Sequence, residues 1–75
     1  MIVYDPVQTG QRILELRRSR NVSVEHIIEA CGLSGPRSFY GWTSGSTRPS
    51  YDSLYALCCV LDVTLDELLV FTVVE

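Results

Sequence analysis

Residues 22–50, VSVEHIIEACGLSGPRSFYGWTSGSTRPS, limit what this chain can fold into more than any other segment. Gly32 separates two short stretches of helical character, over about residues 23–31 and 35–44, and it can adopt the left-handed conformation that ends a helix. Gly45 is expected to end the second stretch. The segment therefore predicts two short helices that a tight turn sets at an angle to each other.

Three residues mark where these two helices begin. Ser23 is a favourable N-cap for the first, because its hydroxyl can accept a hydrogen bond from a free backbone N–H of the first turn. Ser34 is expected to cap the second helix in the same way. Pro36 follows in the first turn of that helix, where a missing N–H costs little.

Helical signals continue on both sides of this segment. Apolar spacing of three to four residues predicts a helix over about residues 8–20. Ser50 is expected to cap a further helix over residues 50–61, and Thr64 to cap a short last one. The side chains of these last two helices that are expected to face inwards are Leu54, Leu57, Cys58, Leu61, Leu65, Leu68 and Leu69.

The fold class predicted from these elements is all-α, a compact domain of five helices over residues 1–75 with its core in residues 8–70. The tails, residues 1–5 and 71–75, favour extended structure. They can fray, or they can pair antiparallel within one chain or between two. The sequence leaves these alternatives open.

Two aromatic residues give the second motif helix an inner face. Phe39 and Trp42 are three residues apart, so they lie on the same side of a helix. Phe39 is expected in the core, and Trp42 either in the core or at its edge with its indole N–H bonded to a backbone group.

The charges divide the chain into a basic and an acidic part. All six cations are arginines between Arg12 and Arg48, so residues 1–48 carry a net charge of +2 and residues 49–75 a net charge of −5. Local potential steers a polyanion more than the overall net charge of −3 does. Arginine can grip phosphate and guanine with its planar fork. The absence of lysine is equally consistent with the coding bias of a GC-rich genome.

Arginines also cluster at the end of the first predicted helix, where Arg17, Arg18 and Arg20 stand. Cations at that end interact favourably with the helix dipole, and they can also contact phosphate groups. The two roles are compatible. Ser23 and Ser34 stand at helix N-termini, whose backbone N–H groups can bind phosphate as well.

No pattern in the chain is typical of a catalyst or a metal site. His26, the only histidine, is expected at the surface, and nothing pairs it with a serine or cysteine nucleophile. Cys31, Cys58 and Cys59 lack zinc-site spacing and are expected to be reduced. No apolar run approaches ~20 residues, and the N-terminus lacks the regions of a signal peptide. We therefore expect a cytoplasmic protein that is not an enzyme and needs no cofactor or metal.

Residues 9–71 resemble the Cro/cI-type helix-turn-helix regulators, also called XRE-type or lambda-repressor-like. The segments that match are TGQRILELRRSRNVSVEHIIEACGLS and GWTSGSTRPSYDSLYALCCVLDVTLDELLVF. The resemblance implies a five-helix lambda-repressor-like domain that binds operator DNA, often as a dimer.

The chain departs from the family's usual pattern in its motif. Val24 replaces a glutamine that can hold a phosphate, and Ile28 replaces a small alanine where the motif helices touch, which is expected to push them apart. Gly41 replaces a lysine or arginine and weakens the helix by up to ~1 kcal/mol relative to alanine. The turn is also one residue longer, through Gly35 and Pro36.

The expected DNA-reading surface is the side of the second motif helix opposite Phe39 and Trp42. Arg37 lies near the N-terminal end of that helix and can grip a guanine or a phosphate. Tyr40 can pack on a sugar or a thymine methyl group, or lie partly buried. The expected DNA contacts are Ser34, Arg37, Ser38, Tyr40, Gly41, Thr43, Ser44, Ser46, Thr47 and Arg48, with Arg17, Arg18, Arg20 and Ser23 as further phosphate contacts.

Two functions are consistent with these observations. The first is a sequence-specific regulator that binds double-stranded DNA as a homodimer, with no membrane and no small-molecule substrate as partner. The alternative is a protein-interaction module on the same scaffold, such as an antitoxin or adaptor, with weak or no DNA binding. The acidic second half favours the alternative, as do the surplus apolar residues Tyr55, Cys59, Val60, Phe71, Val73 and Val74.

Overall fold

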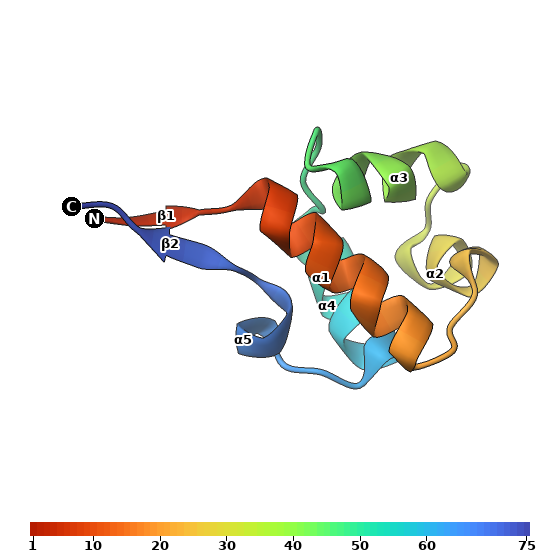
Figure 1. Ribbon diagram of the computed structural model, residues 1–75. Helices are drawn as coiled ribbons and strands as arrows, with labels where there is room; N and C mark the ends of the chain where they lie inside the picture. The colour runs from red at the N-terminus through yellow and green to blue at the C-terminus, as the bar shows by residue number, and fades with distance from the viewer.

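The computed structural model describes residues 1–75 as five helices and a pair of short strands formed by the two ends of the chain (Figure 1). This confirms the predicted five-helix domain. None of the helices combines the length and the apolar character that a bilayer crossing requires. In chain order the elements are β1 (Ile2–Tyr4), α1 (Pro6–Ser19), α2 (Val24–Cys31), α3 (Pro36–Ser44), α4 (Tyr51–Leu61), α5 (Leu65–Leu68) and β2 (Phe71–Val73).

Asp5 and Pro6 start α1 two residues before the predicted position. The Asp5 carboxylate accepts a hydrogen bond from the backbone N–H of Gln8 at 3.0 Å, and Pro6 occupies the first turn. Asp5 and Pro6 thus end the extended N-terminal segment and start the helix, which leaves Thr9 and Gly10 buried inside α1.

The predicted turn between α2 and α3 forms, but one predicted cap is wrong. Ser23 accepts a hydrogen bond from the first turn of α2 at 3.1 Å, and Gly32 ends α2 with a φ of 67°, both as expected. Ser34 does not cap α3, because Gly35 holds the N-cap position and no side chain bonds there. The extra residue of the turn delays the helix to Pro36, so Ser34 stands too early to reach its free N–H groups.

Polar caps also start the last two helices, as predicted. The hydroxyl of Ser50 accepts a hydrogen bond from the backbone N–H of Ser53 at 3.2 Å. The N–H of Thr64 donates to the carboxylate of Glu67 at 2.9 Å, and the N–H of Glu67 donates to the hydroxyl of Thr64 at 3.3 Å. This reciprocal capping box stabilises α5, which is only four residues long.

Eight buried apolar side chains form one core between the helices. Phe39 is completely buried, as predicted, and Trp42 keeps 5% of its surface exposed. Leu65 was expected to face inwards but is 50% exposed, because α5 is a single turn of which only Leu68 is buried. The core consists of Ile13, Ile27, Phe39, Trp42, Leu57, Leu61, Val63 and Leu68.

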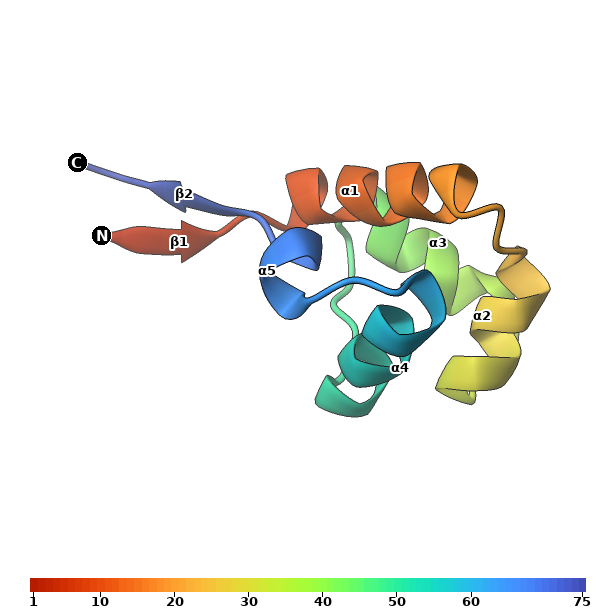
Figure 2. The same cartoon turned by 90° about the horizontal axis from the view of Figure 1, so that it is seen from below.

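β1 and β2 pair as an antiparallel ribbon that projects from the helical body (Figures 1 and 2). Tyr4 lies opposite Phe71, and main-chain hydrogen bonds extend the pairing to the first residue of the chain. At the base of the ribbon, the N–H of Val70 donates to the hydroxyl of Thr9 at 2.9 Å. Of the alternatives that the sequence left open, the tails therefore pair within one chain.

Candidate nucleic-acid interface

The aromatic side of α3 holds this helix against α1 and the core. The rings of Phe39 and Trp42 lie with their centroids 6.4 Å apart, and both are buried. Gly10 of α1 permits a close approach of the two helices, because a Cβ atom there would overlap the backbone carbonyl groups of Trp42 and Thr43. The opposite side of α3 therefore faces outwards, on the upper edge of the molecule in Figure 1.

The outward side of α3 and the loop that follows it line a shallow hollow rich in hydroxyl groups. Arg37 is the only cation in this lining, which contains no carboxylate. A duplex would meet hydrogen-bond donors and one positive charge here, without a repelling acid. The lining residues are Ser34, Arg37, Ser38, Tyr40, Gly41, Trp42, Ser44, Ser46 and Thr47. The structure thus brings together eight of the ten residues predicted as DNA contacts on α3 and its flanks.

Gly41 fastens the loop after α3 to the outer surface of the helix. Its carbonyl accepts hydrogen bonds from the N–H groups of Ser46 and Thr47, at 3.0 and 3.2 Å, and from the hydroxyl of Ser44 at 3.1 Å. A Cβ atom at this position would run into the hydroxyl of Thr47. Gly41, at a position where the family that the sequence resembles usually has a lysine or arginine, therefore makes room for a hydroxyl-bearing loop.

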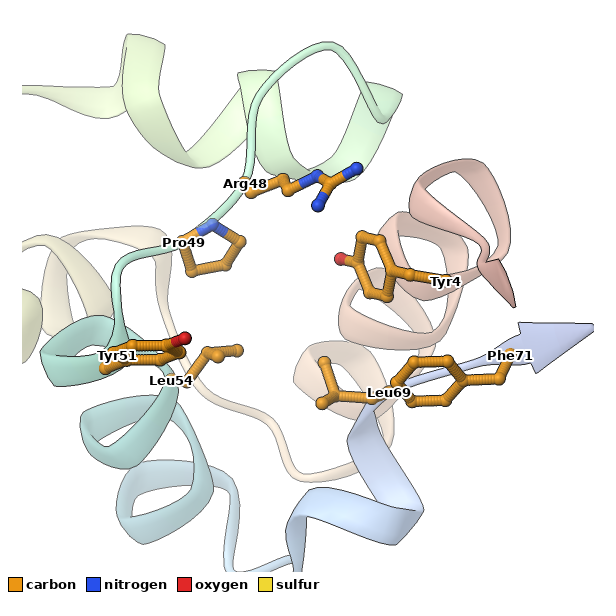
Figure 3. A pocket seen from close by; sticks show the side chains of 7 residues that line it. All are labelled: Tyr4, Arg48, Pro49, Tyr51, Leu54, Leu69 and Phe71. Carbon is orange, nitrogen blue, oxygen red and sulfur yellow. The ribbon is translucent and has the colours of Figure 1, made fainter. Parts of the chain in front are cut away.

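Two predicted contacts lie away from the hollow. Thr43 is half-buried, and its hydroxyl donates to the carbonyl of Tyr40 at 3.1 Å. The guanidinium carbon of Arg48 lies 4.8 Å from the centre of the Tyr4 ring, at the edge of an apolar groove (Figure 3). A cation stacked on an aromatic ring is held there by the ring's negative face. The structure therefore groups Arg48 with the ribbon and not with α3.

The arginines at the end of α1 are partly engaged within the protein. Arg17 and Arg20 each donate to a backbone carbonyl group, at 3.1 and 3.0 Å. Arg18 is exposed, and so is Ser23, whose hydroxyl serves as the cap of α2. These hydrogen bonds give Arg17 and Arg20 a structural role in addition to the helix-dipole interaction expected from the sequence, and phosphate contact by these four residues stays a prediction.

Two of the three cysteines, Cys31 and Cys58, are placed as weak nucleophiles. Burial raises the pKa of the Cys31 thiol. Burial also raises the pKa of Cys58, with smaller contributions from the charges of Cys59 and Glu67. A protonated thiol reacts poorly, since the thiolate is the nucleophile. No group of three or more side chains is placed to hold a metal ion, and His26 is exposed.

Two residues shape this surface without having been predicted as contacts. Trp42 borders the hollow although its ring belongs to the core. The sequence left open a core position or an edge position for Trp42, and the structure combines the two. Gly10 positions α3 from a neighbouring helix, and a glycine inside a helical pattern is a usable signal of close backbone approach.

The chain is similar to known regulators in both sequence and structure. The crystal structure of the restriction-modification controller protein C.AhdI from Aeromonas hydrophila superimposes with a TM-score of 0.74 and 31% identity, covering 85% of this chain and 96% of that one. The HTH-type transcriptional regulator AnsR of Bacillus subtilis (strain 168) is 36% identical over 58 residues, which are 77% of this chain. The chain spans about half of AnsR, since the match covers 49% of its length. No protein-family model matches the sequence.

Proposed function

Because the chain belongs to the Cro/cI-type helix-turn-helix family of transcriptional regulators, we propose that it controls transcription by binding a specific operator through the outward side of α3. The observation that carries this proposal is the hollow on α3, which combines hydroxyl groups and Arg37 and contains no acid. In regulators of this architecture the second motif helix lies in the major groove of DNA. The acidic residues of the second half do not line that surface.

The residues along the hollow suit different parts of a duplex. Arg37 stands in the first turn of α3, close to where base edges are met, and its fork matches the two acceptors of guanine. Tyr40, 54% exposed, offers a ring to a thymine methyl group or a sugar. The hydroxyl groups of Ser44, Ser46 and Thr47 lie at the loop end of the hollow, where contacts with phosphate would set the register on the DNA.

A homodimer on a pseudo-palindromic site is the form in which we expect the protein to act. One small domain reads few base pairs, and two copies related by a two-fold axis place their recognition helices in successive major grooves, about 34 Å apart. We place this regulator in the cytoplasm, with its operator. Neither a cofactor nor a small-molecule substrate enters this mechanism.

Fluorescence anisotropy with labelled duplexes from the protein's own gene neighbourhood tests the proposal, with a scrambled duplex as control. We expect one fragment to bind at least ~10³-fold more tightly than the control. Affinity for both duplexes should fall steeply between about 50 and 200 mM salt, because phosphate contacts release counterions. Equal affinity for all duplexes, or the absence of salt-dependent binding, would argue against a sequence-specific regulator.

The alternative function, a protein-interaction module with weak or no DNA binding, is favoured by a different observation. Tyr51 is 90% exposed and Tyr55 is 74% exposed, both on α4 and away from the hollow. Exposed aromatic side chains of this size often mark a surface that binds protein. A protein partner for α4 is compatible with DNA binding by α3, so only failure of the anisotropy experiment would favour the alternative as the sole function.

A further inference from the structure

The side chain of Thr47 lies over the outer side of α3, at the position where a side chain of residue 41 would begin. A Cβ atom built on Gly41 would come within 2.5 Å of the Thr47 hydroxyl oxygen and 3.5 Å of its methyl carbon. Gly41 is one helical turn after Arg37, and both residues line the hollow. Thr47, a loop residue, therefore presents its side chain on the surface of a helix to which it does not belong.

Backbone hydrogen bonds hold the loop in this position. Gly45 reverses the chain at the end of α3 with a φ of 81°, in the left-handed region that favours glycine. The N–H of Thr47 then donates to the carbonyl of Gly41 at 3.2 Å, next to the N–H of Ser46 at 3.0 Å. A substitution that changes only the side chain of Thr47 therefore leaves these bonds in place.

Thr47 is also the residue of this loop whose hydroxyl group is free. The hydroxyl groups of Ser44 and Ser46 lie 3.1 and 3.3 Å from the carbonyl oxygen of Gly41, to which they donate, and 3.1 Å from each other. Each hydroxyl group has a single hydrogen, so either serine must break a bond before it can donate to DNA. The Thr47 side chain is exposed and makes no hydrogen bond within the protein.

The place of Thr47 on α3 favours contact with bases. In a helix-turn-helix protein the outer side of the second motif helix enters the major groove, where its side chains meet base edges. A threonine hydroxyl can donate to a base or accept from one, and the threonine methyl group can pack on the methyl group of thymine. Thr47 stands beside Gly41, one turn along the helix from Arg37, so its contacts would follow those of Arg37 along the groove.

We propose that Thr47 reads a base pair in place of the side chain that Gly41 lacks, and that Gly41 is the positioning residue that makes room for it. The inference rests on the proposed function and narrows it, because it moves Thr47 from the phosphate contacts to the base contacts. It also accounts for a recognition helix without a side chain in the middle of its outer surface, since the loop supplies one.

Anisotropy titrations of Thr47→Val test the base contact, with the preferred operator, its single-base-pair variants and a scrambled duplex as probes. Valine keeps the shape of threonine without the hydroxyl group, so affinity for the operator should fall about 10-fold. Affinity for the scrambled duplex should hardly change. One base-pair change that weakens wild-type binding should have no effect on Thr47→Val, which still discriminates at the other positions. Thr72→Val, the matched control on β2, should bind every duplex as wild type does.

Gly41→Ala tests the positioning role. The added methyl group displaces the hydroxyl of Thr47, and only the tip of a side chain has to move. Urea denaturation should therefore show little change in stability, whereas affinity for the operator should fall about 10-fold, with loss of the same base-pair preference. In a Thr47→Ala background the nearest side-chain atom is the Cβ atom of residue 47, 3.5 Å away, so Gly41→Ala should have no further effect on binding.

The outcomes separate this inference from the proposed function. An equal loss on all duplexes for Thr47→Val would assign the residue to phosphate, and no loss would remove it from the interface; either result overturns the inference and leaves the regulator intact. Additive losses for Gly41→Ala and Thr47→Ala would overturn the positioning role of Gly41. A wild-type protein that prefers no duplex would overturn the proposed function and this inference with it.

Discussion

α1 and the residue that follows it carry four of the six arginines, whereas α3 carries one. Three of the four, Arg12, Arg17 and Arg20, donate hydrogen bonds to backbone carbonyl groups of the protein itself. Arg37 on α3 is exposed and borders a hollow without acids. The number of cations in a helix therefore does not locate a nucleic-acid surface, and the freedom of each guanidinium group to reach a ligand is the better guide.

The largest effect on stability is expected for a substitution where α1 and α3 cross. Gly10→Ser places a side chain against the backbone carbonyls of Trp42 and Thr43, which cannot move without displacing α3. The substitution should lower the free energy of unfolding by about 3 kcal/mol, measured by urea denaturation. Gly35→Ser is the matched control, because its Cβ atom meets open space and serine is a good N-cap. Equal stability of the two variants would show that α1 does not fix α3.

Arg37→Ala should separate binding from stability. It removes the one cation of the hollow, so affinity for the preferred operator should fall by ~1–3 kcal/mol in anisotropy titrations. The free energy of unfolding should stay within about 0.5 kcal/mol of wild type, as expected for an exposed side chain. A uniform loss on every duplex would assign Arg37 to phosphate, and no loss at all would contradict its place in the interface.

Arg20→Ala should lower the stability of the protein and leave its choice of operator unchanged. It removes a hydrogen bond to the carbonyl of Leu61 and should lower the free energy of unfolding by about 1 kcal/mol. Sequence preference of the folded variant should be unchanged. Arg18→Ala is the control from the same turn, with a change in stability within about 0.5 kcal/mol. If Arg18 or Arg20 also contacts a phosphate, its replacement should make the slope of log affinity against log salt concentration less negative by about 0.9.

The smallest expected effect concerns pH. Hydrogen bonds from the backbone and the hydroxyl of Thr64 lower the pKa of Glu67, and the charge of Arg20 adds to this shift. The pKa of Glu67 is lower in the folded state than in the unfolded chain. The stabilisation that comes from its ionised carboxylate is therefore present at pH values above the unfolded-state pKa, and it is lost as the pH falls through the folded-state pKa. Thermal melts from neutral to acidic pH should show less acid destabilisation for Glu67→Gln, which keeps a capping side chain without the titration.

Local signals predicted the helices well, because capping depends on only three or four residues. Ser23, Ser50 and Thr64 each cap the helix expected of them. The prediction that Ser34 caps α3 was wrong, because the preference of serine for N-caps does not reveal which of two neighbouring residues starts the helix. The prediction that Leu65 faces inwards was wrong, because periodicity assumes a helix long enough to have an inner and an outer face, and α5 has a single turn.

The grouping of residues around α3 was also predictable, since the burial of Phe39 and Trp42 decides which side faces outwards. The position of Arg48 could not be predicted, because it depends on Tyr4, a residue 44 positions earlier in the chain. The same holds for Arg12 and Arg20, whose carbonyl partners lie 55 and 41 residues away. Contacts of this range are set by the assembled fold and leave no mark in local spacing.

β1 and β2 belong to opposite ends of the chain, so their pairing closes nearly the largest loop that 75 residues allow. The entropic cost of that closure is smaller once α1 and α5 already lie together, joined by the bond from Arg12 to the carbonyl of Glu67. The ribbon is thus expected to form late in folding, after the helices have collapsed through contacts of shorter range. Weakening the ribbon should then speed the unfolding of the molecule while hardly slowing its refolding.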